Sequence, residues 1–191
     1  AGHVFDLRGR TVGLLGFGNI GPLVARKLQA FDCEIRVWDP FISPDKPELA
    51  LYGCRLVGKE TALDSDIVSL HVRSDSQMLT REDIAKLKPG CYFINTARPH
   101  LIDNQALYEA LRDGRVMGAA FDVFMEEPIS PDNPYLTLDN VTLSNHRGGV
   151  TENCYSDSPA FLLGEMENYR AGRPVRFFVN ERELAAKRAT N

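Results

Sequence analysis

The stretch between residues 11 and 39 constrains the fold of this chain more than any other part of the sequence. An apolar run at residues 11–15 precedes a G-x-G-x-x-G pattern at residues 16–21. A segment with apolar residues at helical spacing follows, and a second apolar run at residues 35–38 leads directly to Asp39. This order predicts a strand, a glycine turn, a helix and a second strand that ends at an acidic residue.

Each glycine of the pattern has a physical task in such a turn. Gly16 permits the tight turn at the end of the strand, and Gly18 has no side chain, so a pyrophosphate can approach the backbone. Gly21 allows the helix to pack close to the sheet. The first N–H groups of the helix have no partner within it and lie at the positive end of its dipole, so they favour an anion. We therefore expect a dinucleotide site.

Asp39 indicates which dinucleotide binds. A carboxylate at the end of the second strand can accept hydrogen bonds from the hydroxyls of the adenosine ribose. The 2′-phosphate of NADP would be repelled there, and no Arg or Lys follows Asp39 until Lys46, so NAD is the expected cofactor. The alternative is a glycine turn without a ligand, but the strand, the helix and the acid around the pattern favour the cofactor.

The composition is that of an ordinary globular protein and argues against some partners. The 191 residues carry a formal net charge of -4 with no basic cluster, which argues against nucleic acid or an anionic membrane as the main partner. No apolar run approaches transmembrane length and no signal pattern opens the chain, so we expect a cytoplasmic protein. The four cysteines are scattered without a C-x-x-C pair, and we expect reduced, mostly buried thiols and no metal site.

Strands and helices are predicted to alternate along the rest of the chain. After a loop at 40–47, strands are predicted near residues 54–57, 67–72, 92–95, 116–123 and 141–143, and helices near 59–63, 80–87, 103–111 and 151–170. Pro159 predicts a kink or a split in the last helix, and residues from about 181 onward are expected to form a frayed tail. The alternation predicts an α/β fold of the Rossmann type, a doubly wound and mostly parallel sheet with helices on both faces.

Polar side chains stand just after several predicted strands, where ligands bind in an open parallel sheet. They are Asp39, His71, Arg98, Asp122, Glu127 and His146. Taken with the glycine turn, they predict one convergent site.

Four of these residues could act together. Arg98 offers a forked donor for a carboxylate or carbonyl oxygen. His146 can carry and release a proton near neutral pH, and Glu127 could stabilise its imidazolium form. Asp122 could accept a hydrogen bond from an amide such as the carboxamide of nicotinamide. Structural alternatives are a surface salt bridge, a loop histidine, a solvated acid and a turn-forming aspartate.

The other three histidines are weaker candidates for chemistry. His3 lies in the lead-in, and His71 is expected to pack at a strand end. His100 follows Arg98 closely and is expected to be exposed. His146 is therefore the preferred proton carrier.

A set of ordered sequence blocks carries a family resemblance. The blocks are residues 15–21, 38–40, 88–90, 95–98, 103–107, 118–128 and 146–149. In their order and spacing they resemble the NAD-binding domain of the D-2-hydroxyacid dehydrogenases, and the resemblance covers nearly the whole chain.

The resemblance implies a catalytic triad in which Arg98 binds the substrate, His146 is the acid/base and Glu127 is its carboxylate partner. It implies hydride transfer between NAD(H) and a small D-2-hydroxy acid or 2-oxo acid, in a homodimer. Besides Gly16, Gly18, Gly21 and Asp39, the implied cofactor-binding residues are Asn19 and Ile20 at the pyrophosphate, Val72 through its backbone, and Thr96, Ala97, Arg98, Asp122, His146, Gly148 and Gly149 around the nicotinamide.

The chain departs from the family pattern at several positions. Arg73 stands where proline is common, Pro99 where glycine is usual and Asn145 where proline is common, and the loop at 74–78 looks shortened. Family members also form a substrate domain mainly from residues before the nucleotide domain. We expect that residues 1–191 form the NAD-binding domain without that substrate domain, as a fragment that binds NADH but has little turnover.

Two other functions stay open at this point. One is a non-catalytic NAD-binding module that recruits protein partners, as in related corepressors. The other is an NAD-dependent enzyme of another class with this fold, such as a formate dehydrogenase, which Glu127 in place of a glutamine disfavours.

Overall fold

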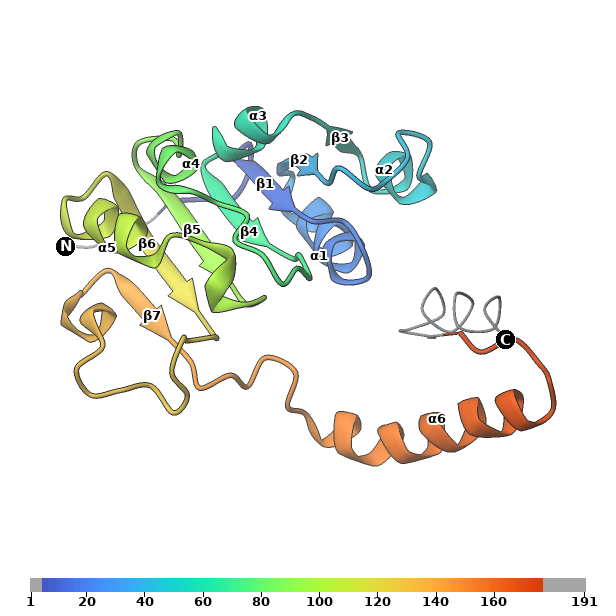
Figure 1. Cartoon of the computed structure of the whole chain (residues 1–191). Coiled ribbons are helices and arrows are strands. Elements are labelled where there is room, and N and C mark those ends of the chain that lie inside the picture. Colours follow the sequence, from blue (N-terminus) through green and yellow to red (C-terminus); the bar gives the residue numbers. More distant parts are fainter. Residues whose placement is uncertain (1–4, 177–191) are drawn as a thin grey trace, which may run out of the picture. The chain divides into compact units, whose positions relative to one another are not determined.

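A computed structural model describes residues 5–176 of the chain (Figure 1). The chain divides into two compact units, residues 1–148 and 149–191. All seven strands lie in the first unit, and a long helix lies in the second. The predicted tail from residue 181 lies outside the described residues.

Seven parallel strands form one sheet in the order β3-β2-β1-β4-β5-β6-β7. They are β1 (Thr11–Leu15), β2 (Glu34–Trp38), β3 (Cys54–Leu56), β4 (Ile67–Leu70), β5 (Cys91–Asn95), β6 (Val116–Phe121) and β7 (Val141–Leu143). The chain runs outward from β1 to β3 and then returns to the other side of β1, so the strand order reverses between β1 and β4. The predicted doubly wound, Rossmann-type α/β fold is confirmed.

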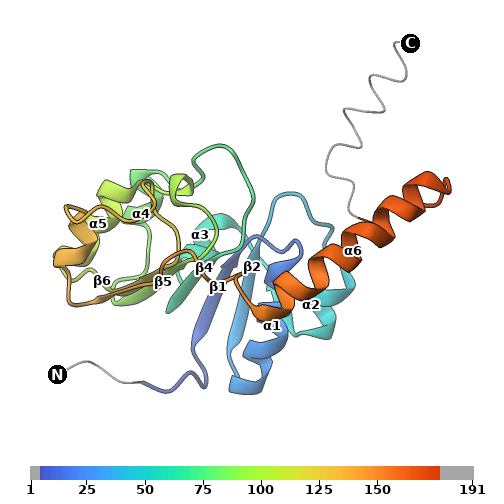
Figure 2. The same cartoon turned by 90° about the horizontal axis from the view of Figure 1, so that it is seen from below.

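Helices cover both faces of the sheet around β1. They are α1 (Ile20–Leu28), α2 (Pro47–Leu51), α3 (Lys59–Leu63), α4 (Arg81–Ala85) and α5 (Asn104–Arg112), with short 3-10 helices at Gln29–Phe31, Pro99–Leu101 and Pro134–Thr137. Figure 2 shows α1 and α2 on one side of the β1–β2 region and α3, α4 and α5 on the other.

Successive residues of β1 belong to two different apolar cores. Leu14 packs in one core with Ala25 of α1 and Leu49 of α2. Leu15 packs in the larger core with Leu63 of α3 and with residues of α4 and α5. Burial on both faces explains why the sequence of this strand is an unbroken apolar run.

Small residues form the buried side of α1. They are Gly21, Pro22 and Ala25, and a side-chain carbon at Gly21 would lie 2.4 Å from the carbonyl oxygen of Gly16. The larger Ile20 is 59% exposed. The close packing predicted for Gly21 is therefore confirmed.

The predicted helix starts are confirmed at three caps. The Thr80 hydroxyl accepts a hydrogen bond from the N–H of Asp83, and the Asp83 carboxylate accepts one from the N–H of Thr80. Asp103 and Thr151 accept hydrogen bonds from backbone N–H groups at the starts of α5 and of the long helix in the second unit.

The strands β3 and β4 end earlier than predicted, β6 lies within the stretch predicted to contain a strand, and one helix was missed. β4 ends at Leu70, and its partners in the ladder, Leu15 and Asn95, are the last residues of their own strands. The ladder therefore has no partners farther along, and β6 ends at Phe121 for the same reason. The short α2 begins at Pro47, at the end of the stretch predicted to be a loop.

The helix of the second unit, α6 (Glu152–Arg170), is continuous through Pro159, so a split at this proline is the wrong prediction. Proline removes one helical N–H group, but no residue of α6 is buried, so water can satisfy the carbonyl oxygen that loses its partner. Within residues 5–176, no helix combines the length and the apolar character needed to cross a membrane.

The cysteines occupy four separate environments. Cys91 is buried and Cys33 and Cys54 are half-buried, whereas Cys154 on α6 is exposed, contrary to the general expectation. Burial raises the pKa of Cys54 and of Cys91 to about 11, so both are neutral thiols near neutral pH.

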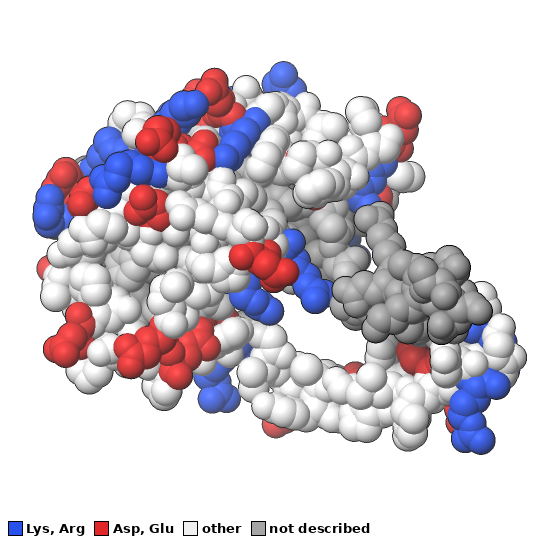
Figure 3. Space-filling model, viewed as in Figure 1, with Lys and Arg blue, Asp and Glu red and all other residues white. Residues whose placement is uncertain are grey.

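Charged side chains of both signs are interspersed over α4 and α5 (Figure 3). An ion pair joins these helices, with Arg81 Nη1 2.7 Å from Glu109 Oε2. Exposed pairs of this kind contribute little stability individually.

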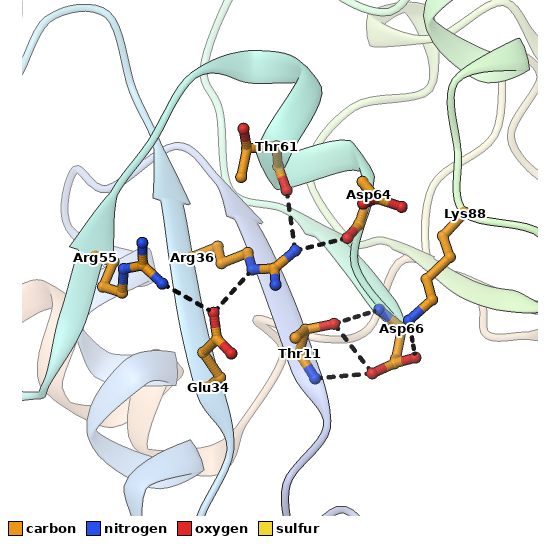
Figure 4. A network of polar contacts seen from close by, with 8 residues as sticks. All are labelled: Thr11, Glu34, Arg36, Arg55, Thr61, Asp64, Asp66 and Lys88. Atoms are coloured by element: carbon orange, nitrogen blue, oxygen red, sulfur yellow. Dashed lines mark hydrogen bonds and ion pairs between the residues drawn. The ribbon is translucent and has the colours of Figure 1, made fainter.

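A polar cluster around Asp66 ties the amino end of β1 to the start of β4. The Asp66 carboxylate accepts hydrogen bonds from the N–H of Thr11 at 2.9 Å and from the Lys88 ammonium at 2.7 Å. Figure 4 shows this cluster beside Arg36, whose guanidinium donates to the carbonyl oxygen of Asp64 at 2.7 Å. Burial alone would raise the pKa of Asp66, but the hydrogen bonds from Lys88 and Thr11 outweigh it and lower the pKa to about 2.

The Asp66 carboxylate should therefore stabilise the fold in a pH-dependent way. Because its pKa is depressed in the folded state, the stabilisation is complete above the unfolded pKa, about 4, and is lost as the pH falls toward about 2. We expect Asp66→Asn to lower the free energy of unfolding by about 1 kcal/mol at pH 7. Urea unfolding at pH 7 and pH 3 measures this.

The matched control is Asp64→Asn, since the side chain of Asp64 is exposed and makes no hydrogen bond within the described residues. Equal destabilisation by the two variants, or a difference between them that is as large at pH 3 as at pH 7, would contradict the role assigned to Asp66.

Candidate cofactor site and active site

A cavity of about 770 Å³ lies at the carboxyl ends of β1, β2, β4 and β5. Predicted cofactor residues that line it are Gly16, Gly18, Asn19, Ile20, Asp39, Val72, Thr96, Ala97 and Arg98. The structure thus brings most of the predicted cofactor residues, from four separate loops, to one cavity.

The register of the sheet explains why these loops meet. Leu15 lies opposite Trp38 on one side and Leu70 on the other. Leu70 lies opposite Asn95, which is in turn opposite Phe121. Phe121 pairs with Leu143 of β7. Six strands therefore end on one line, and the chain leaves each strand at the same edge of the sheet.

The glycine turn is shaped by close contacts at both ends and is open in the middle. Gly16 has a φ of +97°, and a side-chain carbon there would lie 2.6 Å from the carbonyl oxygen of His71. A carbon added at Gly18 would meet no atom within 4 Å. Gly16 is therefore required by the fold, whereas Gly18 leaves space that faces the cavity.

Asp39 braces the glycine turn. Its Oδ2 accepts a hydrogen bond from the N–H of Phe17 at 2.8 Å, and its Oδ1 accepts one from the N–H of Phe41 at 2.9 Å. A carboxylate has about four acceptor positions, so two remain for ribose hydroxyls. The bracing role was not predicted from the sequence, because the distance between turn and acid is set only by the paired strands.

The residues at the cavity fit a dinucleotide. The N-cap residue of α1, Asn19, makes no side-chain cap, so the first N–H groups of the helix are available to an anion beside Gly18. The helix start, the open position at Gly18 and the carboxylate of Asp39 supply donors for phosphates and acceptors for ribose in one cavity.

Asn95 shapes the loop that carries Arg98. Its buried amide donates to the carbonyl oxygen of Arg98 at 2.9 Å and accepts from the N–H of Ala97 at 3.0 Å. The Arg98 side chain is exposed and donates to the carbonyl oxygen of Ala97 at 2.7 Å. Asn95 was missed as a site residue, although a buried amide at the last position of a strand is a signal for such a role.

Asp122 holds the loop that carries His146. It is buried and accepts hydrogen bonds from the Ser144 hydroxyl at 2.6 Å and from the N–H groups of Arg147 and Gly148 at 2.9 and 2.8 Å. Burial would raise the pKa of Asp122, but these hydrogen bonds lower it. The predicted contact with a nicotinamide amide stays a prediction, and only one acceptor position of Asp122 is left for it.

Glu127 and His146 are brought together as predicted. His146 Nδ1 lies 2.8 Å from Glu127 Oε2, and Glu127 Oε1 accepts from the N–H of Phe124 at 2.9 Å. The hydrogen bond with His146 is the largest cause of the lowered pKa of Glu127. Because Nδ1 faces the carboxylate, Nε2 is the ring atom left for proton exchange. The pair follows β6 and β7 and is not among the residues that line the cavity.

The other described histidines, His71 and His100, are engaged by neighbouring polar groups. His71 is half-buried with Nε2 3.0 Å from the Ser69 hydroxyl, and burial lowers its pKa to about 4, so it is neutral near neutral pH. The prediction that His100 is exposed is wrong. It is half-buried and its Nε2 lies 2.8 Å from the carbonyl oxygen of Ser74, because the loops after β4 and β5 pack together.

Three further residues predicted to bind the cofactor, Gly21, Gly148 and Gly149, do not line the cavity. Gly21 packs against the glycine turn and does not line the cavity. Gly148 lies against Asp122, where a side-chain carbon would be 2.9 Å from Oδ2. Gly149 is the first residue of the second unit.

Comparison with known proteins identifies the family. Residues 1–148 match the family described as D-isomer specific 2-hydroxyacid dehydrogenase, NAD binding domain. The chain belongs to this family. The match confirms NAD as the cofactor of this domain.

Curated relatives carry the names of dehydrogenases and reductases. The chain is 36% identical over 179 residues to a D-3-phosphoglycerate dehydrogenase of Archaeoglobus fulgidus, a match that covers 92% of this chain and 34% of that protein. It is 42% identical over 152 residues to a hydroxypyruvate reductase of Thermotoga maritima, covering 76% of this chain and 48% of that protein. The chain therefore spans between a third and a half of these relatives. Relatives of this kind give the non-catalytic alternative no support.

Solved structures show the same fold. The apo D-mandelate dehydrogenase of Rhodotorula graminis superposes with a TM-score of 0.82 at 26% identity, covering 90% of this chain and 51% of that one. A glyoxylate reductase of Paecilomyes thermophila has a TM-score of 0.78 at 32% identity, covering 86% of this chain and 50% of that one.

A side chain at Gly18 should block the cofactor without harming the fold. We expect Gly18→Leu to leave the free energy of unfolding within about 0.5 kcal/mol, since no atom lies near the added carbon. NADH affinity should fall at least about tenfold, because the side chain would occupy the path of the pyrophosphate. Fluorescence titration with NADH measures the affinity.

Gly58→Leu is the control, since Gly58 also has open space around it but lies before α3, outside the cavity. Unchanged NADH affinity in Gly18→Leu would show that the pyrophosphate does not approach this position.

Proposed function

We propose that the complete protein transfers a hydride between NAD(H) and a small D-2-hydroxy acid or 2-oxo acid. The observation that carries this proposal is the hydrogen bond of 2.8 Å between His146 Nδ1 and Glu127 Oε2. It supports an oriented acid/base at the strand edge that also bears the cofactor cavity. The acids named for the relatives, glyoxylate, hydroxypyruvate and D-3-phosphoglycerate, support the substrate class.

Each member of the proposed triad has a distinct task. Bound NADH supplies the hydride for reduction of a 2-oxo acid, and NAD accepts it in the reverse direction. In the reduction, His146 donates a proton from Nε2 to the developing alkoxide oxygen. Glu127 favours the imidazolium form before that transfer and fixes the orientation of the ring. Arg98 binds the substrate carboxylate through its guanidinium fork.

The remaining parts of the proposal concern the assembly. We propose that residues 1–191 hold the NAD-binding domain, of which the family match covers residues 1–148. We further propose a cytoplasmic homodimer, which the resemblance to the D-2-hydroxyacid dehydrogenases supports. Sedimentation of the complete protein would test the dimer.

The decisive experiment replaces His146 in the complete protein. We expect His146→Gln to lower kcat about a thousandfold, because general acid catalysis is lost, while the Kd for NADH stays within about threefold. NADH oxidation with glyoxylate, hydroxypyruvate and pyruvate, and NAD reduction with D-3-phosphoglycerate, measure the rate and the preferred acid.

Glu127→Gln should lower kcat by a smaller factor, and Glu126→Gln is its matched control, since the neighbouring Glu126 is exposed. Full turnover in His146→Gln would remove this residue from the role. Absence of turnover in the unaltered protein with every acid of the panel would argue against the proposed activity.

A further inference from the structure

The loop after β4 brings a second arginine to the cofactor cavity. Val72, Arg73 and Ser74 line the cavity together with Gly18 and Asn19 of the glycine turn. Arg73 lines the cavity but has no role in the proposed triad. Its place at the cavity therefore requires an explanation of its own.

Arg73 lies in the loop after β4, at the point where the strand order reverses between β1 and β4. β4 is the neighbour of β1, and their last residues, Leu70 and Leu15, lie opposite each other. Gly18 of the glycine turn is the third residue after Leu15, and Arg73 is the third residue after Leu70. The loop with Arg73 and the amino end of α1 thus flank the same part of the cavity.

Hydrogen bonds hold this loop in place. The carbonyl oxygen of Ser74 lies 2.8 Å from His100 Nε2. Farther along, the N–H groups of Met78 and Leu79 both donate to the carbonyl oxygen of Leu101, at 2.8 and 2.9 Å. The backbone on the carboxyl side of Arg73 is therefore fastened to the loop that follows β5.

The charge of Arg73 is not neutralised by the protein. Among the described residues that line the cavity, two are basic, Arg73 and Arg98. Arg73 is exposed, and within residues 5–176 it forms no ion pair with an acidic side chain. The glycine turn itself carries no basic residue, so the helix start lacks a cation of its own.

The position of Arg73 along the cavity indicates which part of the dinucleotide it can contact. In the proposed site, Asp39 at the end of β2 binds the ribose of the adenosine, and Arg98 beyond β5 lies at the nicotinamide end. The strands β1 and β4 lie between β2 and β5 in the sheet. The diphosphate joins these two halves and must cross the ends of β1 and β4, where Arg73 lies. A guanidinium offers paired N–H donors that match phosphate oxygens.

We propose that Arg73 binds the diphosphate of the dinucleotide from the side opposite the start of α1. The helix N–H groups contact one side of the diphosphate, and the guanidinium neutralises its charge from the other. The inference rests on NAD binding by this domain and adds a specific residue to it.

The test measures ligand affinity of the full chain with Arg73→Gln. Trp38 is the single tryptophan of the chain and lines the cavity, so its fluorescence reports binding. We expect the Kd values for NADH and for ADP-ribose to rise alike, by about tenfold, because both ligands carry the diphosphate. The Kd for adenosine, which carries no phosphate, should stay within about twofold. Arg73→Lys should recover part of the affinity.

The matched control is Arg26→Gln. Arg26 lies in the last turn of α1, is exposed and does not line the cavity, so the variant has the same change in net charge. Its affinities should stay within about twofold. The effect of Arg73→Gln should also shrink as the salt concentration rises, since charge interactions are screened.

Several outcomes would overturn the inference. Unchanged affinity of Arg73→Gln for ADP-ribose, or an equal loss for adenosine, would exclude a diphosphate contact. If the unaltered chain bound neither NADH nor ADP-ribose, NAD binding itself would fail, which is a different result from normal binding that is insensitive to Arg73.

Discussion

The parallel register of the sheet is the constraint on which the rest of this structure depends. It places the last residues of six strands, Trp38, Leu15, Leu70, Asn95, Phe121 and Leu143, on one line. Every segment with a proposed function leaves the sheet from that line. A slip of one strand by one residue would exchange its two faces and also displace its loop. The two apolar cores that fix the register therefore also fix the site.

The strand ends share a second feature, in which a short polar side chain at the end of a strand binds the backbone of its own loop or of a neighbouring loop. Asp39 binds the N–H groups of Phe17 and Phe41, and Asn95 binds the backbone of the loop with Arg98. Asp122 binds backbone N–H groups of the loop with His146. Loops at ligand sites expose backbone polar groups that need partners. These side chains satisfy such groups. They thereby preorganise the loops that carry the glycine turn, Arg98 and His146.

The sequence predicts the fold and the location of the site well, because both depend on local patterns. Apolar runs and glycine positions predict β1, β2 and the turn at Gly16, and the family resemblance implies the pairing of Glu127 with His146. Contacts between distant loops are not local, so the contact of His100 with Ser74 and the loop-bracing role of Asp122 were missed. The exact strand ends were missed for the same reason, since the length of a strand depends on its neighbours in the sheet.

The double duties of Asp39 and Asp122 change how substitutions at this site must be interpreted. Removing the Asp39 carboxylate would remove the proposed ribose ligand and would also free the N–H of Phe17 in the glycine turn. A loss of NAD affinity would then have two causes, the displacement of the glycine turn and the loss of the proposed ribose contact. Asp122 is the stronger case, because it is buried and three of its acceptor positions are already used. A kinetic defect after substitution of Asp122 would be caused mainly by displacement of His146, and less by a lost contact with the cofactor.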